Sequence, residues 1–280
     1  MKKITTLGLA CALVAAGVSG ADTIRPSSPL ETIEDGTPMT MTYELKASAW
    51  ALFIPVTGKA TFNIDLKPDT YAIKGKVKTT GLADILVNYD MDLASSGYVR
   101  DEKLRTYAYV SQNHDGKKDR RVEMTYANND VAMTAVPAFG NLGDPAATTA
   151  QKLDADDPVT ALISFALEPR APGADPCGGP MKIFDGRQLT WLMFENHGTK
   201  QVSSDAWKGE AIECHVTMDK VAGYKPGEAN KDTLTGIDGP LVMWLAPLPN
   251  GAHVPVRIEA KTDKIGKVTL QASKLSFSPT

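Results

Sequence analysis

Apolar and polar residues alternate at every second position through most of this chain. The segment KATFNIDL (residues 59–66) has its apolar residues on one face and its polar residues on the other. YAIKGKVK (71–78) repeats the alternation after the turn KPDT. Side chains of a β-strand point to opposite faces in turn, so this period indicates a strand with one buried and one wet face. The two segments predict an antiparallel hairpin.

The same alternation recurs along the chain and predicts roughly twelve strands. It is found in segments 87–93, 121–126, 131–136, 254–262 and 267–277. A single sheet of that size has to curl, split into two layers or close on itself. The predicted fold is therefore all-β with one or two short helices. We expect a strongly curved antiparallel sheet or incomplete barrel wrapped on a helix, with a β-sandwich as the alternative.

One segment has a helical pattern instead. In DADDPVTALISFALEPR, Asp157 is suited to cap a helix that begins at Pro158, and Pro169 ends the run. Val159, Leu162, Ile163 and Ala166 then share one face. The residues before it are rich in Gly, Pro, Ala and Thr, so we expect a connection and a helix at about 137–168. A shorter helical turn is predicted around LADILV (82–87).

The first 21 residues have the pattern of a secretory signal peptide. Lys2 and Lys3 precede an uncharged apolar stretch, and Ser19 and Ala21 are small residues at a cleavage site. We expect a flexible segment at 22–40, a single β-rich domain at 41–280 and a periplasmic location. No later stretch reaches about 20 uncharged apolar residues, so the mature chain is not expected to span a membrane.

Removing residues 1–21 leaves 28 basic and 33 acidic residues. This mildly acidic balance argues against nucleic acid and against an anionic membrane surface as partner.

Two cysteines remain after cleavage, Cys177 and Cys214. In an exported protein such a pair is expected to form a disulfide. The alternative is a thiol nucleophile, in which Cys177 converges with His197 and an aspartate such as Asp185. Cys177 precedes Gly-Gly-Pro and a predicted strand, not a helix, so nothing in the sequence lowers its pKa. The sequence therefore favours the disulfide.

No catalytic residue, metal ligand or cofactor is predicted. The four histidines, His114, His197, His215 and His253, are scattered without metal-ligand spacing. No G-x-S-x-G motif of a hydrolase nucleophile is present.

Two segments are apolar at nearly every position. SAWALFIPVTG (48–58) contains Trp50 and Phe53, and LVMWLAPLP (241–249) contains Trp244. Such segments are typical of strands buried on both faces, or of the wall of a hydrophobic pocket. We expect any surface for an apolar ligand to include Trp50, Phe53 or Trp244.

The order of four segments resembles an exported bacterial family known as domain of unknown function 3108. These segments are TTGLADILVNYD, DDPVTALISF, KIFDGRQLTW and VPVRIEAKTDKIGKVTLQAS. Cys177 and Cys214 resemble the cysteine pair of its alphaproteobacterial branch. The resemblance covers about residues 43–277. It implies export to the periplasm and a curved all-β domain, and it supplies no catalytic residues.

These features lead to one principal hypothesis and two alternatives. The principal one is a non-catalytic periplasmic protein that maintains the cell envelope by binding an apolar ligand, such as a lipid, or an envelope protein. The first alternative is a periplasmic hydrolase in which His197, His215 or His253 meets a carboxylate. The second is an assembly module that docks through an exposed sheet edge.

Overall fold

A computed structural model describes residues 36–51, 54–80, 89–115, 119–226, 238–262 and 266–280. Within these ranges it contains thirteen strands and two helices, α3 (Thr149–Leu153) and α4 (Pro158–Leu167). The strands before the helices are β1 (Met39–Ala51), β2 (Ile54–Leu66), β3 (Thr70–Thr80), β4 (Asp90–Arg100), β5 (Lys103–Asn113), β6 (Arg121–Ala127) and β7 (Asp130–Val136). Those after them are β8 (Met181–Phe184), β9 (Leu189–Ser203), β10 (Lys208–Ala222), β11 (Leu241–Pro247), β12 (His253–Thr262) and β13 (Gly266–Pro279).

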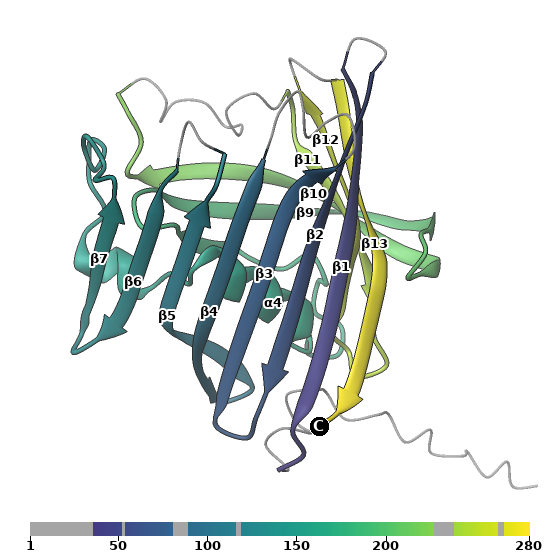
Figure 1. The fold of residues 1–280 in the computed structure, drawn as a ribbon. Coiled ribbons are helices and arrows are strands. Elements are labelled where there is room, and N and C mark those ends of the chain that lie inside the picture. The colour runs from purple at the N-terminus through teal and green to yellow at the C-terminus, as the bar shows by residue number, and fades with distance from the viewer. Residues whose placement is uncertain (1–35, 52–53, 81–88, 116–118, 227–237, 263–265) are drawn as a thin grey trace, which may run out of the picture.

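All the described strands form one antiparallel sheet (Figure 1). Its two edge strands are β7 and β8. Its order is β7-β6-β5-β4-β3-β2-β1-β13-β12-β11-β10-β9-β8. Nearly every strand pairs with its neighbour in sequence, as in a meander. The exception is the middle of the sheet, where β1 pairs with β13 and Met39 lies opposite Pro279. The predicted curved antiparallel sheet is confirmed, and the sheet is not closed.

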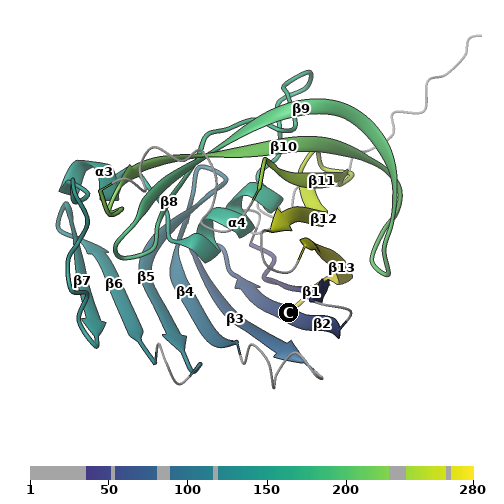
Figure 2. The ribbon, with the colours of Figure 1, turned by 90° about the horizontal axis from the view of Figure 1, so that it is seen from above.

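The sheet curls around α4, which contacts β3, β4 and β5 in one half and β8 and β12 in the other (Figure 2). The inward residues predicted for the first hairpin are buried, among them Phe62, Ile64 and Ile73. They form one core with Ile163 and Leu167 of the helix. Complete burial of such a side chain contributes about 1.5–3 kcal/mol. The contacts of α4 with both halves therefore hold the curled sheet together.

The helix α4 begins and ends where the sequence predicts. Asp157 caps it, accepting hydrogen bonds from the backbone N–H groups of Val159 and Thr160, and Pro158 is its first residue. It is buried over most of its circumference because the sheet surrounds it: Ala161 and Phe165, outside the predicted face, are also buried. The helix α3 was not predicted; Thr148 and Gln151 form its capping box. The turn predicted around LADILV lies outside the described residues.

β8 and β9 form another hairpin, in which Phe184 lies opposite Leu189. Its turn depends on Asp185, whose carboxylate accepts hydrogen bonds from the backbone N–H groups of Arg187 and Gln188. Gly186 supplies the positive φ angle, +99°. The role of Asp185 is thus structural: its carboxylate stabilises the turn.

The two edges of the sheet offer little free strand. The helix α3 packs on β7, and β8 has only four residues. Asp156 bonds to β8 from outside the sheet, since its N–H donates to Lys182 O and its carbonyl accepts from Phe184 N–H. Short and covered edges resist pairing with another chain.

Candidate functional site

An apolar groove of about 260 Å³ lies on the inner face of the sheet, at the end of β1 farthest from Met39. Inward side chains become smaller in this direction along β1, from Tyr43 and Leu45 to Ala47 and Ala49. On β2 they change from Phe62 to Ala60 and Gly58. Small side chains leave space that the large ones fill elsewhere in the core. Val77, Tyr89, Val268 and Leu270 complete the walls.

None of the three aromatic side chains expected at an apolar surface, those of Trp50, Phe53 and Trp244, is described as part of this groove. Phe53 and the side chain of Trp50 lie outside the described part of the structure. Trp244 is on β11, half-buried and packed against the main core. The guanidinium of Arg257 lies over its ring, 5.4 Å from the ring centroid. Trp244 is not among the residues that line the groove.

A buried polar network joins α4 to the sheet. The Asp157 carboxylate accepts hydrogen bonds from the hydroxyls of Ser95 (2.7 Å) and Thr106 (3.0 Å) as well as from the two backbone N–H groups. The hydroxyls of Tyr71 and Thr160 complete the network, 2.7 Å apart. Burial raises the pKa of Asp157, although these four hydrogen bonds favour the ionised carboxylate. Because every acceptor site is occupied, this network holds the helix in place.

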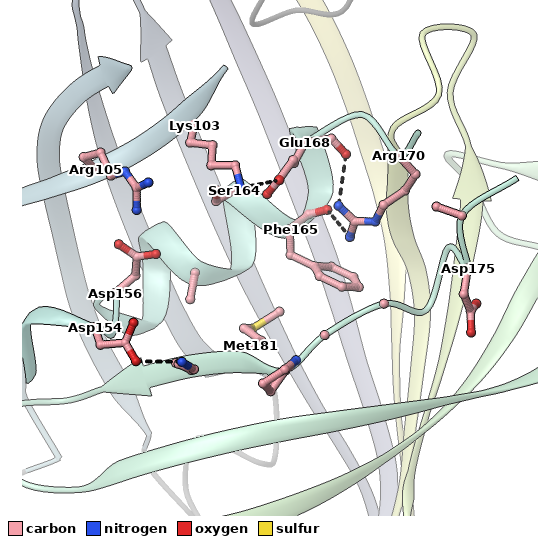
Figure 3. A pocket seen from close by; sticks show the side chains of 16 residues that line it. Lys103, Arg105, Asp154, Asp156, Ser164, Phe165, Glu168, Arg170, Asp175 and Met181 are labelled. Atoms are coloured by element: carbon pink, nitrogen blue, oxygen red, sulfur yellow. Dashed lines mark hydrogen bonds and ion pairs between the residues drawn. The ribbon is translucent and has the colours of Figure 1, made fainter. Parts of the chain in front are cut away.

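A larger cavity, of about 670 Å³, lies beside α4 near the start of β5 (Figure 3). Its walls are highly charged, with four basic and four acidic residues. These are Lys103, Arg105, Arg170 and Lys182, and Asp154, Asp156, Glu168 and Asp175. Two ion pairs cross its rim, Lys103–Glu168 at 3.1 Å and Lys182–Asp154 at 2.6 Å. Phe165 and Met181 provide apolar surface within it.

Asp156 is the most strongly perturbed acid of this cavity. Burial, followed by the neighbouring Asp157 charge, raises its pKa to about 6. Thr106 partly offsets this effect by donating its hydroxyl, 3.2 Å from Oδ1 of Asp156. The folded protein therefore binds a proton at Asp156 more tightly than the unfolded chain does.

We expect this shift to make stability depend on pH. A pKa that is higher in the folded state stabilises the protein fully below about pH 3.8, and that stabilisation is lost as pH rises through about 6. Urea unfolding at pH 4.5 and pH 7.5 should show a loss of about 1–3 kcal/mol at the higher pH that is absent in Asp156→Asn. Equal pH profiles for the wild type and Asp156→Asn would contradict the assignment.

Cys177 and Cys214 form a disulfide, as the sequence predicts. It joins the segment before β8 to the middle of β10. Both cysteines are fully buried, in a second core cluster with Phe165 of α4. With both sulfurs bonded to each other, neither is available as a thiol nucleophile.

The four histidines belong to different elements: His197 lies on β9, His215 on β10 and His253 at the start of β12, and His114 follows β5. His197 and His215 stack across adjacent strands with ring centroids 3.6 Å apart. His215 Nε2 lies 3.2 Å from a carboxylate oxygen of Glu213, beside a surface hollow of about 340 Å³. The residues that line this hollow include no serine and no cysteine. Among the described residues, no three His, Cys, Asp or Glu side chains are grouped as a metal site.

His253 is half-buried, and its Nδ1 has no hydrogen-bond partner among the described residues. Burial, with a smaller effect of Arg170, lowers its pKa. In the described part of the chain, no ion pair joins His253 to a carboxylate such as the hydrolase hypothesis requires.

An open antiparallel sheet curled on a helix, with an apolar groove and a charged cavity inside the curl, defines a barrel-like, predominantly β protein. The chain belongs to the family described as "Protein of unknown function (DUF3108)", whose model matches residues 40–273. This confirms the resemblance to domain of unknown function 3108. No curated protein matches the chain.

Two solved structures are similar over most of the chain. One is a beta-barrel-like protein of domain of unknown function DUF1849 from Brucella abortus, with 9% identity and a TM-score of 0.46. The match covers 86% of this chain and 98% of that one. The other is a DUF1329 family protein from Desulfovibrio piger ATCC 29098, with 9% identity and a TM-score of 0.23. That match covers 89% of each chain.

Proposed function

We propose that this is a non-catalytic periplasmic protein of the cell envelope that binds an apolar ligand, such as a lipid acyl chain, in the groove on the inner face of its sheet. The observation that carries the proposal is the apolar groove between Ala47, Ala60, Val77 and Leu270. Each methylene that a ligand buries there contributes about 0.8 kcal/mol. A ligand enters without competing for hydrogen bonds, because the inward side chains of this wall are largely apolar.

Export is part of the same proposal. It is supported by the signal-peptide pattern of residues 1–21, and the disulfide is consistent with an oxidising compartment. Within the described ranges no helix is long and apolar enough to cross a membrane. We take the strands from β1 (Met39–Ala51) to β13 (Gly266–Pro279) as one domain, which begins two residues before the predicted boundary at residue 41. Mass spectrometry of the protein recovered from periplasm tests both points, since cleavage after Ala21 and a co-purifying lipid each produce a defined mass.

A bulky side chain in the groove should abolish ligand binding. Ala47 is half-buried on the groove wall, and Ala47→Phe fills the space with little disturbance of the packed core beyond it. We expect the affinity for a fluorescent fatty acid, measured by titration, to fall by about tenfold or more, which corresponds to about 1.4 kcal/mol.

The matched control is Asn63→Phe. Asn63 is exposed on β2, on the opposite face from Phe62 and Ile64, so the same side chain is added outside the groove. Its affinity should stay at the wild-type value, and both variants should melt within about 2 °C of the wild type. Wild-type affinity in a correctly folded Ala47→Phe protein would show that the groove is not the binding site.

The two alternatives receive less support from the geometry. A hydrolase could use the His215–Glu213 pair, but the lining of the adjacent hollow provides neither serine nor cysteine as a nucleophile. An assembly module needs a long free edge, whereas β8 is short and α3 packs on β7.

A further inference from the structure

We infer that the charged cavity beside α4 is a second binding site, which holds a small ligand through a carboxylate or phosphate group, with Arg105 as the anchor. This site is separate from the groove of the proposed function. The strand register places them in different rows of the sheet. Arg105 lies opposite Tyr98, which lies opposite Thr70 at the start of β3, whereas Thr79 beside the groove is at the end of β3.

Arg105 is an exposed residue on the wall of the cavity, and its contacts differ from those of the other three basic residues. Lys103 and Lys182 are paired with acids across the rim. Arg170 donates from its two terminal nitrogens to the carbonyl oxygens of Glu168 and Phe165, and its guanidinium stacks over the Phe165 ring. Its buried Nε has no hydrogen-bond partner among the described residues. Arg105 forms no hydrogen bond and no ion pair within the described part of the chain. Its guanidinium and the Asp156 carboxylate attract each other electrostatically.

The acids of the cavity leave no carboxylate that would satisfy Arg105. Glu168 and Asp154 are used in the two rim pairs. Asp175 accepts hydrogen bonds from the backbone N–H of Cys177 and the side chain of Asn196. Asp156 faces the cavity and attracts the Arg105 guanidinium electrostatically, but no hydrogen bond joins the two side chains; its Oδ1 shares the Thr106 hydroxyl with Asp157. An incoming oxyanion therefore does not have to displace an internal partner of Arg105.

The strand that carries Arg105 is open toward the cavity. β5 pairs with β6 only from Ala108 onward, so its first residues have no strand neighbour on that side. Across the cavity, α4 presents Ser164, whose hydroxyl makes no hydrogen bond with the described residues. Figure 3 shows Arg105 and Ser164 on facing elements of the cavity wall. The Arg105 guanidinium and the Ser164 hydroxyl can therefore each donate a hydrogen bond to a ligand.

The chemistry of these donors selects the ligand class. A guanidinium presents five N–H donors in a planar fork that matches the two oxygens of a carboxylate or phosphate. A volume of about 670 Å³ accommodates a ligand larger than the anion itself. Phe165 and Met181 offer that remaining part an apolar contact. We therefore expect an oxyanion attached to a small apolar body to bind more tightly than the bare anion.

The test measures the binding of three probes to the full mature protein by calorimetry at constant ionic strength. Inorganic phosphate and phenyl phosphate represent the phosphate class, and benzoate represents the carboxylate class. Arg105→Gln should weaken the binding of whichever probes the wild type binds by about tenfold or more, which corresponds to about 1.4 kcal/mol. Arg105→Lys should recover only part of the loss, because an ammonium lacks the planar fork.

Arg100→Gln is the matched control, because it removes the same charge from the same β4–β5 hairpin. Arg100 is exposed and lies over the Tyr98 ring, 5.7 Å from its centroid, instead of lining the cavity. It should bind the probes as the wild type does, and so should Ala47→Phe, which separates this site from the groove. Binding to one chemical class alone identifies the anionic group. Absence of binding to all three probes, or equal losses in Arg105→Gln and Arg100→Gln, would overturn the inference.

Discussion

Replacing Cys177 and Cys214 together by alanine is expected to lower the free energy of unfolding by about 4 kcal/mol. The disulfide closes a loop with a sequence separation of 37. Without it the unfolded chain gains conformational freedom, which stabilises the unfolded state. The loss is a large fraction of a typical domain stability of about 5–15 kcal/mol. Urea unfolding at neutral pH, followed by tryptophan fluorescence, measures this change.

A reductant provides the control for this experiment. It should destabilise the wild type toward the value of the double variant and leave the double variant unchanged. Any difference that remains between the two reduced proteins reports the packing of the buried sulfur atoms against Phe165 and Met243. A double variant that is as stable as the oxidised wild type would contradict the structural role of the disulfide.

Asp157→Ala is expected to cost about 3–5 kcal/mol, although it removes only one carboxylate. Asp157 has no exposed surface, and its loss removes the acceptor of four donors, of which Thr106 retains a second carboxylate, Asp156, at 3.2 Å. Two of them are backbone N–H groups in the first turn of α4, and two are the hydroxyls of Ser95 and Thr106. Because water does not reach these groups, their desolvation is not compensated. Chemical denaturation of the variant measures the cost.

Thr148→Ala is the control for the cap itself. Thr148 caps α3 in the same manner as Asp157 caps α4, but it is exposed to water. Its loss should cost about 1 kcal/mol or less. Asp157→Asn should be intermediate, because an amide oxygen can still accept from the helix N-terminus. Similar losses for Thr148→Ala and Asp157→Ala would mean that the buried network adds nothing to the cap.

The sequence predicts the hairpins of this protein because a hairpin depends only on the alternation and the turn residues of one short segment. Alternation assigns Phe62, Ile64 and Ile73 to the inner face, and the turn residues between them define the register. The pairing of β1 with β13 depends on segments more than 200 positions apart, since Tyr43 lies opposite Leu275. Neither segment differs from the other strands in a way that identifies its partner. The alternation therefore predicts a curled sheet without its strand order.

The candidate sites likewise divide into those that the sequence can predict and those that depend on the folded chain. The disulfide could be predicted because the signal peptide leaves two cysteines. The groove could not, because alanine and glycine carry little hydrophobic signal. The decrease from Tyr43 and Leu45 to Ala47 and Ala49 along one inner face is the pattern that could have indicated it. The charged cavity combines residues from β5, α4 and β8, which come together only in the folded chain.

The two adjacent acids before α4, Asp156 and Asp157, have different roles in the structure although they are neighbours in the sequence. Both Asp156 and Asp157 could be explained by helix capping in the sequence. In the structure only Asp157 caps the helix, while Asp156 bonds to β8 through its backbone and faces the cavity with its carboxylate. Adjacent residues at the end of a helix point in different directions, so proximity in sequence does not imply a shared role.

The pairing of β1 with β13 has a consequence for the order in which the molecule is assembled. If the chain is followed from β8 to β13 and then from β1 to β7, every neighbour in the sheet is also the next strand, so the topology is a circularly permuted meander. If the chain emerges N-terminus first, β1 to β7 can form hairpin by hairpin, but the outer side of β1 stays unpaired until the last strand, β13, follows. Thirteen residues of edge are then open to wrong partners. The intermediate in which β1 to β7 have folded and β13 has not yet paired with β1 is therefore the state that a chaperone should bind.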